Sequence, residues 1–289
     1  MICAAAFFSA GAAAQELTPR AYWPLPVGTD VLVLAYQNSS GDVVLDASLP
    51  LTGVDSEIDF FQVAYQRTFG LFGRTTSAQI SLPYADGNTQ GLVEGEFRQR
   101  KTSGVGDARV RLAINLKGAP AMDAQAFQKL RLDPHPVFGA SLTVQAPTGE
   151  YDSDRLINLG TNRWAFKPAL GVIIPMRPTW LFEVEAGAWL FTDNDDYLGR
   201  TLEQDPIGFV ETHLVKQTRR GFWVSLDANY YTGGETRLED GPQQNLQRNT
   251  RVGVTAVVPL NRHHALRASY STGVETRSGG EFDAFSLSY

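Results

Sequence analysis

The feature that most constrains this chain is an alternation of apolar and polar residues that returns in about twelve separate windows. In residues 108–116, for example, every second position is apolar, and Arg109, Arg111 and Asn115 stand among the positions between. Residues 138–146 and 222–231 repeat this pattern. Successive side chains of a strand point to opposite faces, so each window predicts a strand with one apolar and one polar face. That is the pattern of a strand between lipid and a polar lumen.

Weaker copies of the alternation account for most of the remaining chain. They lie at residues 30–37, 60–69, 75–84, 163–174, 180–191, 207–218, 251–259, 264–272 and 281–289. Single-chain bacterial outer-membrane barrels have an even number of strands, and the tally is about 12. The sequence therefore predicts an all-β fold, a transmembrane antiparallel up-and-down β-barrel in the outer membrane of a Gram-negative bacterium.

The connections between the predicted strands alternate in length. Short links lie at residues 70–73, 175–178, 219–221 and 261–263. Long polar links lie at residues 38–57, 85–106, 147–162, 192–206, 233–248 and 273–280. Outer-membrane barrels have short periplasmic turns and long extracellular loops, whereas a soluble β-sandwich has no reason to sort its loops in this way. Both ends of the chain are then expected in the periplasm.

One link departs from this rule. Residues 117–136 form a long segment at a place where a short periplasmic turn is expected. Asp123 is placed to cap a short helix whose apolar face would carry Ala126, Phe127 and Leu130. The segment is interpreted as a decoration of the barrel rim or, alternatively, as a plug or docking handle.

The composition excludes several other classes. The mean hydropathy is -0.18, and no apolar run approaches the ~20 residues of a membrane-spanning helix. The net charge of -6 gives no basic surface for nucleic acid. The uncharged, Ala-rich residues 1–14, which contain the single cysteine, Cys3, are expected to be a signal peptide, with a buried N-terminal segment as the alternative. Residues 15–289 would then form the barrel.

The end of the chain alternates as well. Phe285, Leu287 and Tyr289 are expected on one lipid-directed face and resemble the signal read by the bacterial barrel-assembly machinery, although Asp283 departs from that pattern. The machinery, outer-membrane lipid, lipopolysaccharide and a small-molecule solute are the expected partners.

Charged residues within the predicted strands indicate where a functional site would lie. A Lys or Arg on the lipid face near the bilayer midplane costs ~2–4 kcal/mol, so such residues are expected to face the lumen. The expected lumen residues are Arg109, Arg111, Arg163, Lys167, Glu183, Glu185, Glu211, Asp227, Arg251 and Arg267. They would form either a salt-bridged filling that stabilises the barrel or a constriction that selects solutes.

The sequence gives little support for a catalytic site or a metal site. His263 and His264 are adjacent at a predicted turn, where neighbouring side chains diverge, and residues 193–196 are acidic without the spacing of a calcium loop. His213 lies in a predicted strand, but no G-x-S-x-G motif accompanies it. No catalytic residue, metal site or cofactor is therefore assigned.

Three stretches carry a resemblance to a known family. They are RLINLGTNRWAFKP over residues 155–168 with Leu170 and Gly171 after it, FTDNDD over 191–196, and YSTG over 270–273. From about Val27 onward the chain resembles the outer-membrane β-barrel family associated with the meta-cleavage pathway of phenol degradation. The resemblance implies a channel for passive uptake of small, aromatic or hydrophobic molecules. The alternatives are a closed barrel with a structural or loop-mediated binding role and a lipid-modifying enzyme.

Overall fold

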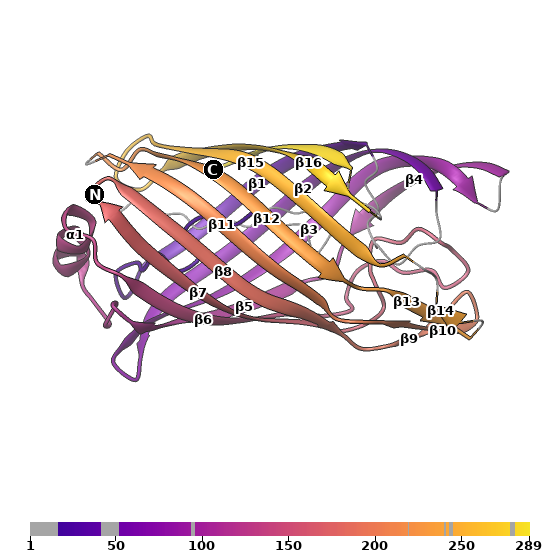
Figure 1. Ribbon diagram of the computed structural model, residues 1–289, viewed down its shortest axis with the longest axis horizontal. Helices are drawn as coiled ribbons and strands as arrows, with labels where there is room; N and C mark the ends of the chain where they lie inside the picture. Colours follow the sequence, from indigo (N-terminus) through magenta and orange to yellow (C-terminus); the bar gives the residue numbers. More distant parts are fainter. Residues whose placement is uncertain are drawn as a thin grey trace.

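The computed structural model describes residues 17–41, 52–93, 96–218, 220–239, 241–242, 245–277 and 281–289. The predicted signal peptide and Cys3 lie outside these residues. Long tilted strands wrap around one axis, as Figure 1 shows. The strands are β1 Asp30–Gly41, β2 Thr52–Leu71, β3 Arg74–Val93, β4 Glu96–Val105, β5 Arg109–Lys117, β6 Val137–Gln145, β7 Ala165–Arg177, β8 Trp180–Phe191, β9 Asn194–Tyr197, β10 Arg200–Gln204, β11 Ile207–Gln217, β12 Trp223–Gly233, β13 Thr236–Leu238, β14 Gly241–Pro242, β15 Gln247–Pro259, β16 Ala265–Thr276 and β17 Phe282–Ser288.

The wall of the barrel closes through antiparallel pairs only. β1 pairs with both β2 and β17, and β2 pairs with β3, which completes the circle. β4 and β5 share one place in the wall, because β3 pairs with β5 near its start and with β4 near its end. The closed barrel therefore has 12 strands, and the prediction of fold and strand number is confirmed. Closure matters because a strand edge left unpaired in lipid would expose unsatisfied backbone groups.

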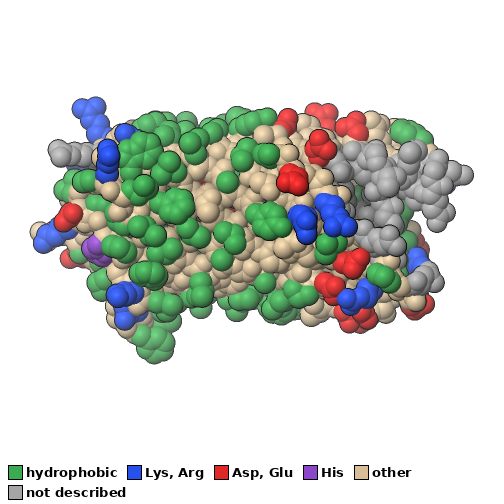
Figure 2. All heavy atoms as spheres, viewed as in Figure 1, with side chains coloured by type: hydrophobic (Ala, Val, Ile, Leu, Met, Phe, Trp, Pro, Cys, Tyr) green, Lys and Arg blue, Asp and Glu red, His purple; other side chains and the backbone are tan. Residues whose placement is uncertain are grey.

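The alternation in the sequence becomes the two faces of this wall. In β12 the odd-numbered positions from Trp223 to Tyr231 are buried inside the barrel, whereas Leu226 and Tyr230 are exposed outside. Figure 2 shows hydrophobic side chains over the middle of the outer surface, with most charged side chains toward the two ends. Apolar side chains on the outside favour lipid contact, and polar side chains are left to fill the lumen.

Three of the expected long loops contain strands that the sequence analysis missed. Residues 85–106 form most of a hairpin in which β3 and β4 pair from Tyr84 and Val105 up to Val93 and Glu96. Residues 192–206 and 233–248 supply a separate small sheet in the order β14-β13-β10-β9. These strands lie at the end of the barrel opposite α1 (Figure 1), away from the apolar band, so they need no apolar outer face and show no alternation.

The segment 117–136 contains one helix, α1 Ala124–Leu132, at the end of the barrel with the short turns. The Asp123 side chain accepts a hydrogen bond from the Ala126 backbone N–H at 2.8 Å, which caps the helix. Phe127 and Leu130 are buried, but Ala126 is exposed, contrary to expectation, because the helix buries only the narrow line through Phe127 and Leu130. Among the described residues, no helix is both long and apolar enough to cross a membrane.

Residues 17–25, called the lumen segment below, run inside the barrel without regular secondary structure. Tyr22, Trp23 and Leu25 pack in one buried cluster with Phe127 and Leu130 of α1. The same cluster includes inward-facing residues of the wall at this end, namely Val137, Ile173, Leu181, Val215, Trp223 and Val257. The lumen segment and α1 together occupy much of the short-turn end of the barrel.

Candidate functional site: the barrel lumen

The structure brings the ten predicted lumen residues to inward-facing positions of the wall. Arg109 is partly exposed within the barrel. The other nine have exposed fractions between 1% and 6%; they are Arg111, Arg163, Lys167, Glu183, Glu185, Glu211, Asp227, Arg251 and Arg267. Since buried charges are stable only when paired or hydrogen-bonded, their contacts define what the lumen can do.

An acidic centre lies near the middle of the lumen. His213 Nδ1 lies 2.9 Å from Asp227 Oδ1, and His213 Nε2 lies 3.7 Å from Glu211 Oε2. Lys167 Nζ lies 3.5 Å from the other oxygen of Glu211. Glu185 and Glu183 are the register neighbours of Glu211 and His213 on β8. His213 is 3% exposed and therefore points into the lumen.

The lumen segment is bonded to this acidic centre. The backbone N–H and the hydroxyl of Thr18 both donate to Glu211 Oε2, at 3.1 Å and 2.9 Å. The backbone N–H of Arg20 donates to Glu183 Oε2 at 2.6 Å, and its guanidinium donates to Gln217. Hydrogen bonds to carboxylates are about twice as strong as neutral ones, so two wall carboxylates hold the segment in place.

Tyr22 anchors the lumen segment in a slot between two glycines. Gly139 and Gly171 are register partners on β6 and β7. A Cβ atom on Gly139 would lie 2.2 Å from Tyr22 Cδ1, and one on Gly171 would lie 2.1 Å from Tyr22 Cε2. The Tyr22 hydroxyl is 2.9 Å from the Ser141 hydroxyl, and the Arg111 guanidinium lies 5.2 Å from the centre of the ring. Only glycine leaves room for the ring at these two positions.

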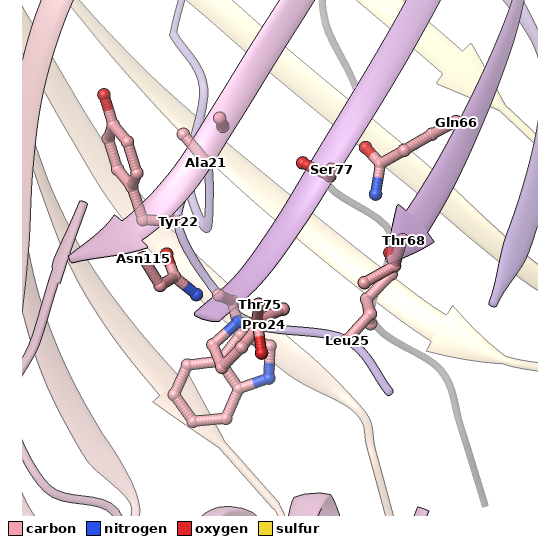
Figure 3. A pocket seen from close by; sticks show the side chains of 11 residues that line it. Ala21, Tyr22, Pro24, Leu25, Gln66, Thr68, Thr75, Ser77 and Asn115 are labelled. Atoms are coloured by element: carbon pink, nitrogen blue, oxygen red, sulfur yellow. The ribbon is translucent and has the colours of Figure 1, made fainter. Parts of the chain in front are cut away.

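A small cavity remains beside the segment, as Figure 3 shows. Leu25 faces it from the lumen segment, whereas Gln66, Ser77 and Asn115 face it from β2, β3 and β5. The strand side of this cavity is polar. The segment therefore does not fill the whole cross-section of the barrel.

Aromatic and basic side chains alternate in the half of the lumen nearer the long loops. Lys167 Nζ lies 4.3 Å from the ring centre of Phe209, and the Arg163 guanidinium lies 4.9 Å from that of Phe191. Trp189 stacks on Phe191 with ring centres 6.4 Å apart. The sequence did not indicate this cluster, because Trp189 shows the same alternation as any other inward-facing strand residue.

Several small residues point inward from the wall formed by β16, β17 and β1, beside the larger Arg267, Phe282 and Gln37. Ser269, Ser271, Ser286 and Ala35 point inward from β16, β17 and β1, yet each keeps part of its surface exposed. The Ser269 and Ser286 hydroxyls are 2.6 Å apart. Their partial exposure shows that these side chains border unfilled space inside the barrel.

The other predicted residues lie on the outside of the barrel. Phe285, Leu287 and Tyr289 are exposed on one face of the last strand region, and the Tyr289 hydroxyl lies 2.5 Å from His264 Nδ1. In the described part of the chain, no group of three or more His, Cys, Asp or Glu is arranged to hold a metal ion.

Comparison with known proteins shows the family. The family described as "Putative MetA-pathway of phenol degradation" matches residues 35–289. No curated protein sequence matches the chain.

Solved structures show the same fold. The COG4313 outer membrane channel from Pseudomonas putida F1 is similar with a TM-score of 0.77 and 22% identity, over 94% of this chain and 97% of that one. The NanC porin is similar with a TM-score of 0.50 and 9% identity, over 89% of this chain and 98% of that one. The chain is thus an outer-membrane β-barrel, and it belongs to the family described as the putative MetA-pathway of phenol degradation.

Proposed function

We propose that the protein is a passive outer-membrane channel for small solutes, aromatic or hydrophobic ones among them, and that its inward-facing charges form the constriction. One observation carries the proposal: charged side chains line the inside of a closed barrel, and small, partly exposed side chains such as Ser269 and Ser286 lie there with them. Following the rule for this class, the short-turn end with residues 117–136 faces the periplasm and the long loops face outward.

The alternative is that the charged side chains fill the lumen and only stabilise the barrel. Removing one partner of a buried ion pair is costly, and that cost alone explains why such charges are paired. Arg109 favours the selective role, because it keeps part of its surface exposed inside the barrel while its Nε donates to Gln145 at 2.9 Å. A side chain that borders unfilled space in the lumen interacts with any solute that passes through the barrel.

The first prediction tests the constriction. Replacing Arg109 and Arg111 together by Ala removes two positive charges and two long side chains from the lumen. Single-channel conductance in a planar bilayer should rise, and selectivity should shift away from anions, because fewer positive charges then attract them.

A matched control removes the same charge elsewhere. Arg220 and Arg262 are exposed in short turns, so their replacement by Ala should leave conductance and selectivity unchanged. Wild-type conductance and selectivity in a correctly folded Arg109→Ala, Arg111→Ala protein would refute the constriction.

A closed barrel is the second candidate, and the lumen segment favours it. With Tyr22 seated in its slot and Thr18 and Arg20 bonded to the wall, the segment occupies the path toward the short-turn end. Wild-type protein without measurable conductance at any voltage would favour a structural or loop-mediated binding role.

A further inference from the structure

Three side chains form a row on the outer surface of the barrel, at its short-turn end. Arg177 of β7 and Trp180 of β8 are register partners, and Trp180 is also the partner of Lys216 of β11. Register partners on neighbouring antiparallel strands share one face of the sheet. Lys216 is exposed, whereas its neighbours Val215 and Gln217 are buried inside the barrel, so this face is the outer one. We call Arg177, Trp180 and Lys216 the rim row.

A β-bulge brings Arg177 to the outer face. Ile173 is buried inside the barrel, so strict alternation would turn Arg177, four residues later, inward as well. The pairing of β7 with β8 shifts between Pro175 and Arg177, and Met176 is the extra residue. Arg177 therefore lies opposite Trp180 and is exposed. The bulge places a second cation beside the tryptophan.

The rim row borders the apolar band of the outer surface. The next outward-facing row on the same three strands consists of Ile174, Phe182 and Leu214, which are again register partners. Two strand residues span ~7 Å, which is about the thickness of one headgroup layer of a bilayer. Figure 2 shows Lys and Arg side chains next to hydrophobic surface at the short-turn end. The rim row therefore lies at the level of the lipid headgroups.

The two cations of the rim row keep their charge. Within the described ranges of the chain, no carboxylate forms an ion pair with Arg177 or Lys216. The outward-facing positions of β7, β8 and β11, which are described in full, hold no Asp or Glu. Lys216 Nζ lies 4.4 Å from the centre of the Trp180 ring, a contact that orients the ammonium group without neutralising it. Two positive charges thus flank one amphipathic ring.

Another cation on the same rim is compensated. Arg67 and Tyr65 face outward near the end of β2, and both contact Asp30 of β1. Arg67 Nη1 lies 3.1 Å from Asp30 Oδ1, and the Tyr65 hydroxyl donates to the same oxygen at 2.6 Å. A carboxylate therefore neutralises the guanidinium at this place. The rim row differs from it by having two cations and no such carboxylate.

We infer that the rim row binds the headgroup of an anionic phospholipid in the periplasmic leaflet of the outer membrane. The phosphate would lie between Arg177 and Lys216. Trp180 would pack where the headgroup meets the acyl chains, because tryptophan favours that interface. Cations at headgroup level attract anionic lipids, and the apolar row beside them accommodates the acyl chains. The site lies outside the lumen, so it goes beyond the channel function and does not depend on conductance.

The experiment uses native mass spectrometry of the protein purified from outer membranes in detergent. The protein is mixed with equal amounts of phosphatidylglycerol and phosphatidylethanolamine that carry the same acyl chains. It should retain about fivefold more phosphatidylglycerol, because the ammonium group of phosphatidylethanolamine already compensates the phosphate. Equal retention of the two lipids by the wild-type protein overturns the inference.

Two variants tie the preference to the rim row. Arg177→Gln and Lys216→Gln should each reduce the preference for phosphatidylglycerol by about threefold to fivefold. Arg67→Gln is the matched control, because it removes the same charge from the same rim but from a residue that is paired with Asp30; it should keep the wild-type preference. Heat-modified migration in gel electrophoresis shows that each variant is folded. Equal reduction in all three variants would mean that net charge alone attracts the lipid, and the site would fail.

A soluble anion distinguishes a lipid site from a site for free phosphate. Glycerol 3-phosphate carries a phosphate group but no acyl chains. Added at the same concentration as the lipid, it should leave bound phosphatidylglycerol in place, because the acyl chains also bind the apolar row. Displacement of the lipid at equal concentration would assign the rim row to soluble phosphates and overturn the lipid site.

Discussion

At the scale of single residues, two missing side chains decide where the lumen segment lies. Gly139 and Gly171 face each other across β6 and β7, and the Tyr22 ring occupies the space that their Cβ atoms would take. A glycine inside a strand weakens the strand, and an aromatic ring packed over it recovers buried surface. The glycine pair and Tyr22 are therefore one structural unit, although more than a hundred residues separate them in the chain.

The packing of Tyr22 against the two glycines predicts the effect of a single added methyl group. In Gly171→Ala, the new Cβ would lie 2.1 Å from Tyr22 Cε2, so the ring must leave its slot. The backbone amides of Ala21, Tyr22, Trp23 and Leu25 should then exchange hydrogen faster, as measured by mass spectrometry. Gly208→Ala is the control, because its Cβ meets no atom closer than 3.8 Å. Unchanged exchange in Gly171→Ala would show that the slot does not hold the segment.

At the scale of elements, the alternation predicted the wall because each wall strand has lipid on one face. The 12 wall strands follow from that single constraint, and so does the inward direction of residues such as Arg111 and Glu211. The β3 and β4 hairpin escaped prediction because its residues, such as Asn88 and Thr89, lie beyond the apolar band. There, a strand needs no apolar face.

The lumen segment escaped prediction for a different reason. Its position depends on contacts with residues far away in sequence, such as the bond from Thr18 to Glu211 across 193 positions. No periodicity within residues 17–25 reports such contacts. The aromatic residues show the same limit: Trp164 and Tyr230 are exposed on the outside, but Trp189, Trp223 and Tyr231 are buried inside. The alternation predicts on which face of the wall a strand residue lies, but it does not predict which residues of other segments pack against it.

The helix α1 offers a prediction at this scale. Asp123→Ala removes the bond to the Ala126 N–H and should destabilise the helix by about 1 kcal/mol. Amides in the first turn of α1 should then exchange faster, while strand amides keep their protection. Asp123→Asn is the matched control, since Asn caps helices about as well as Asp. If Asn and Ala behave alike, the cap bond contributes nothing measurable.

At the scale of the whole molecule, the barrel separates three environments. Lipid-facing apolar side chains cover the outside, the lumen segment and α1 occupy the short-turn end, and charged, aromatic and small side chains line the rest of the lumen. The wall must be rigid enough to keep these three environments apart. The continuous backbone pairing of its strands provides that rigidity. The cost of placing a charge on the outside should therefore depend on depth in the bilayer alone, and not on local contacts.

Leu226 and Leu260 make this dependence measurable. Leu226 lies on β12 between Leu214 and Val254, is 61% exposed, and sits well inside the apolar band. Leu260 is 54% exposed but follows the last residue of β15, at the short-turn end. Leu226→Arg should lower the free energy of unfolding by ~2–4 kcal/mol, and Leu260→Arg by only ~0–1 kcal/mol. Guanidinium titration of the protein refolded in lipid vesicles measures both changes in the free energy of unfolding.

Because both leucines are similarly exposed, loss of the same packing cannot explain a difference between the two variants. Equal destabilisation would mean that Leu226 does not face the hydrocarbon core, and the assignment of the outer surface would fail with it.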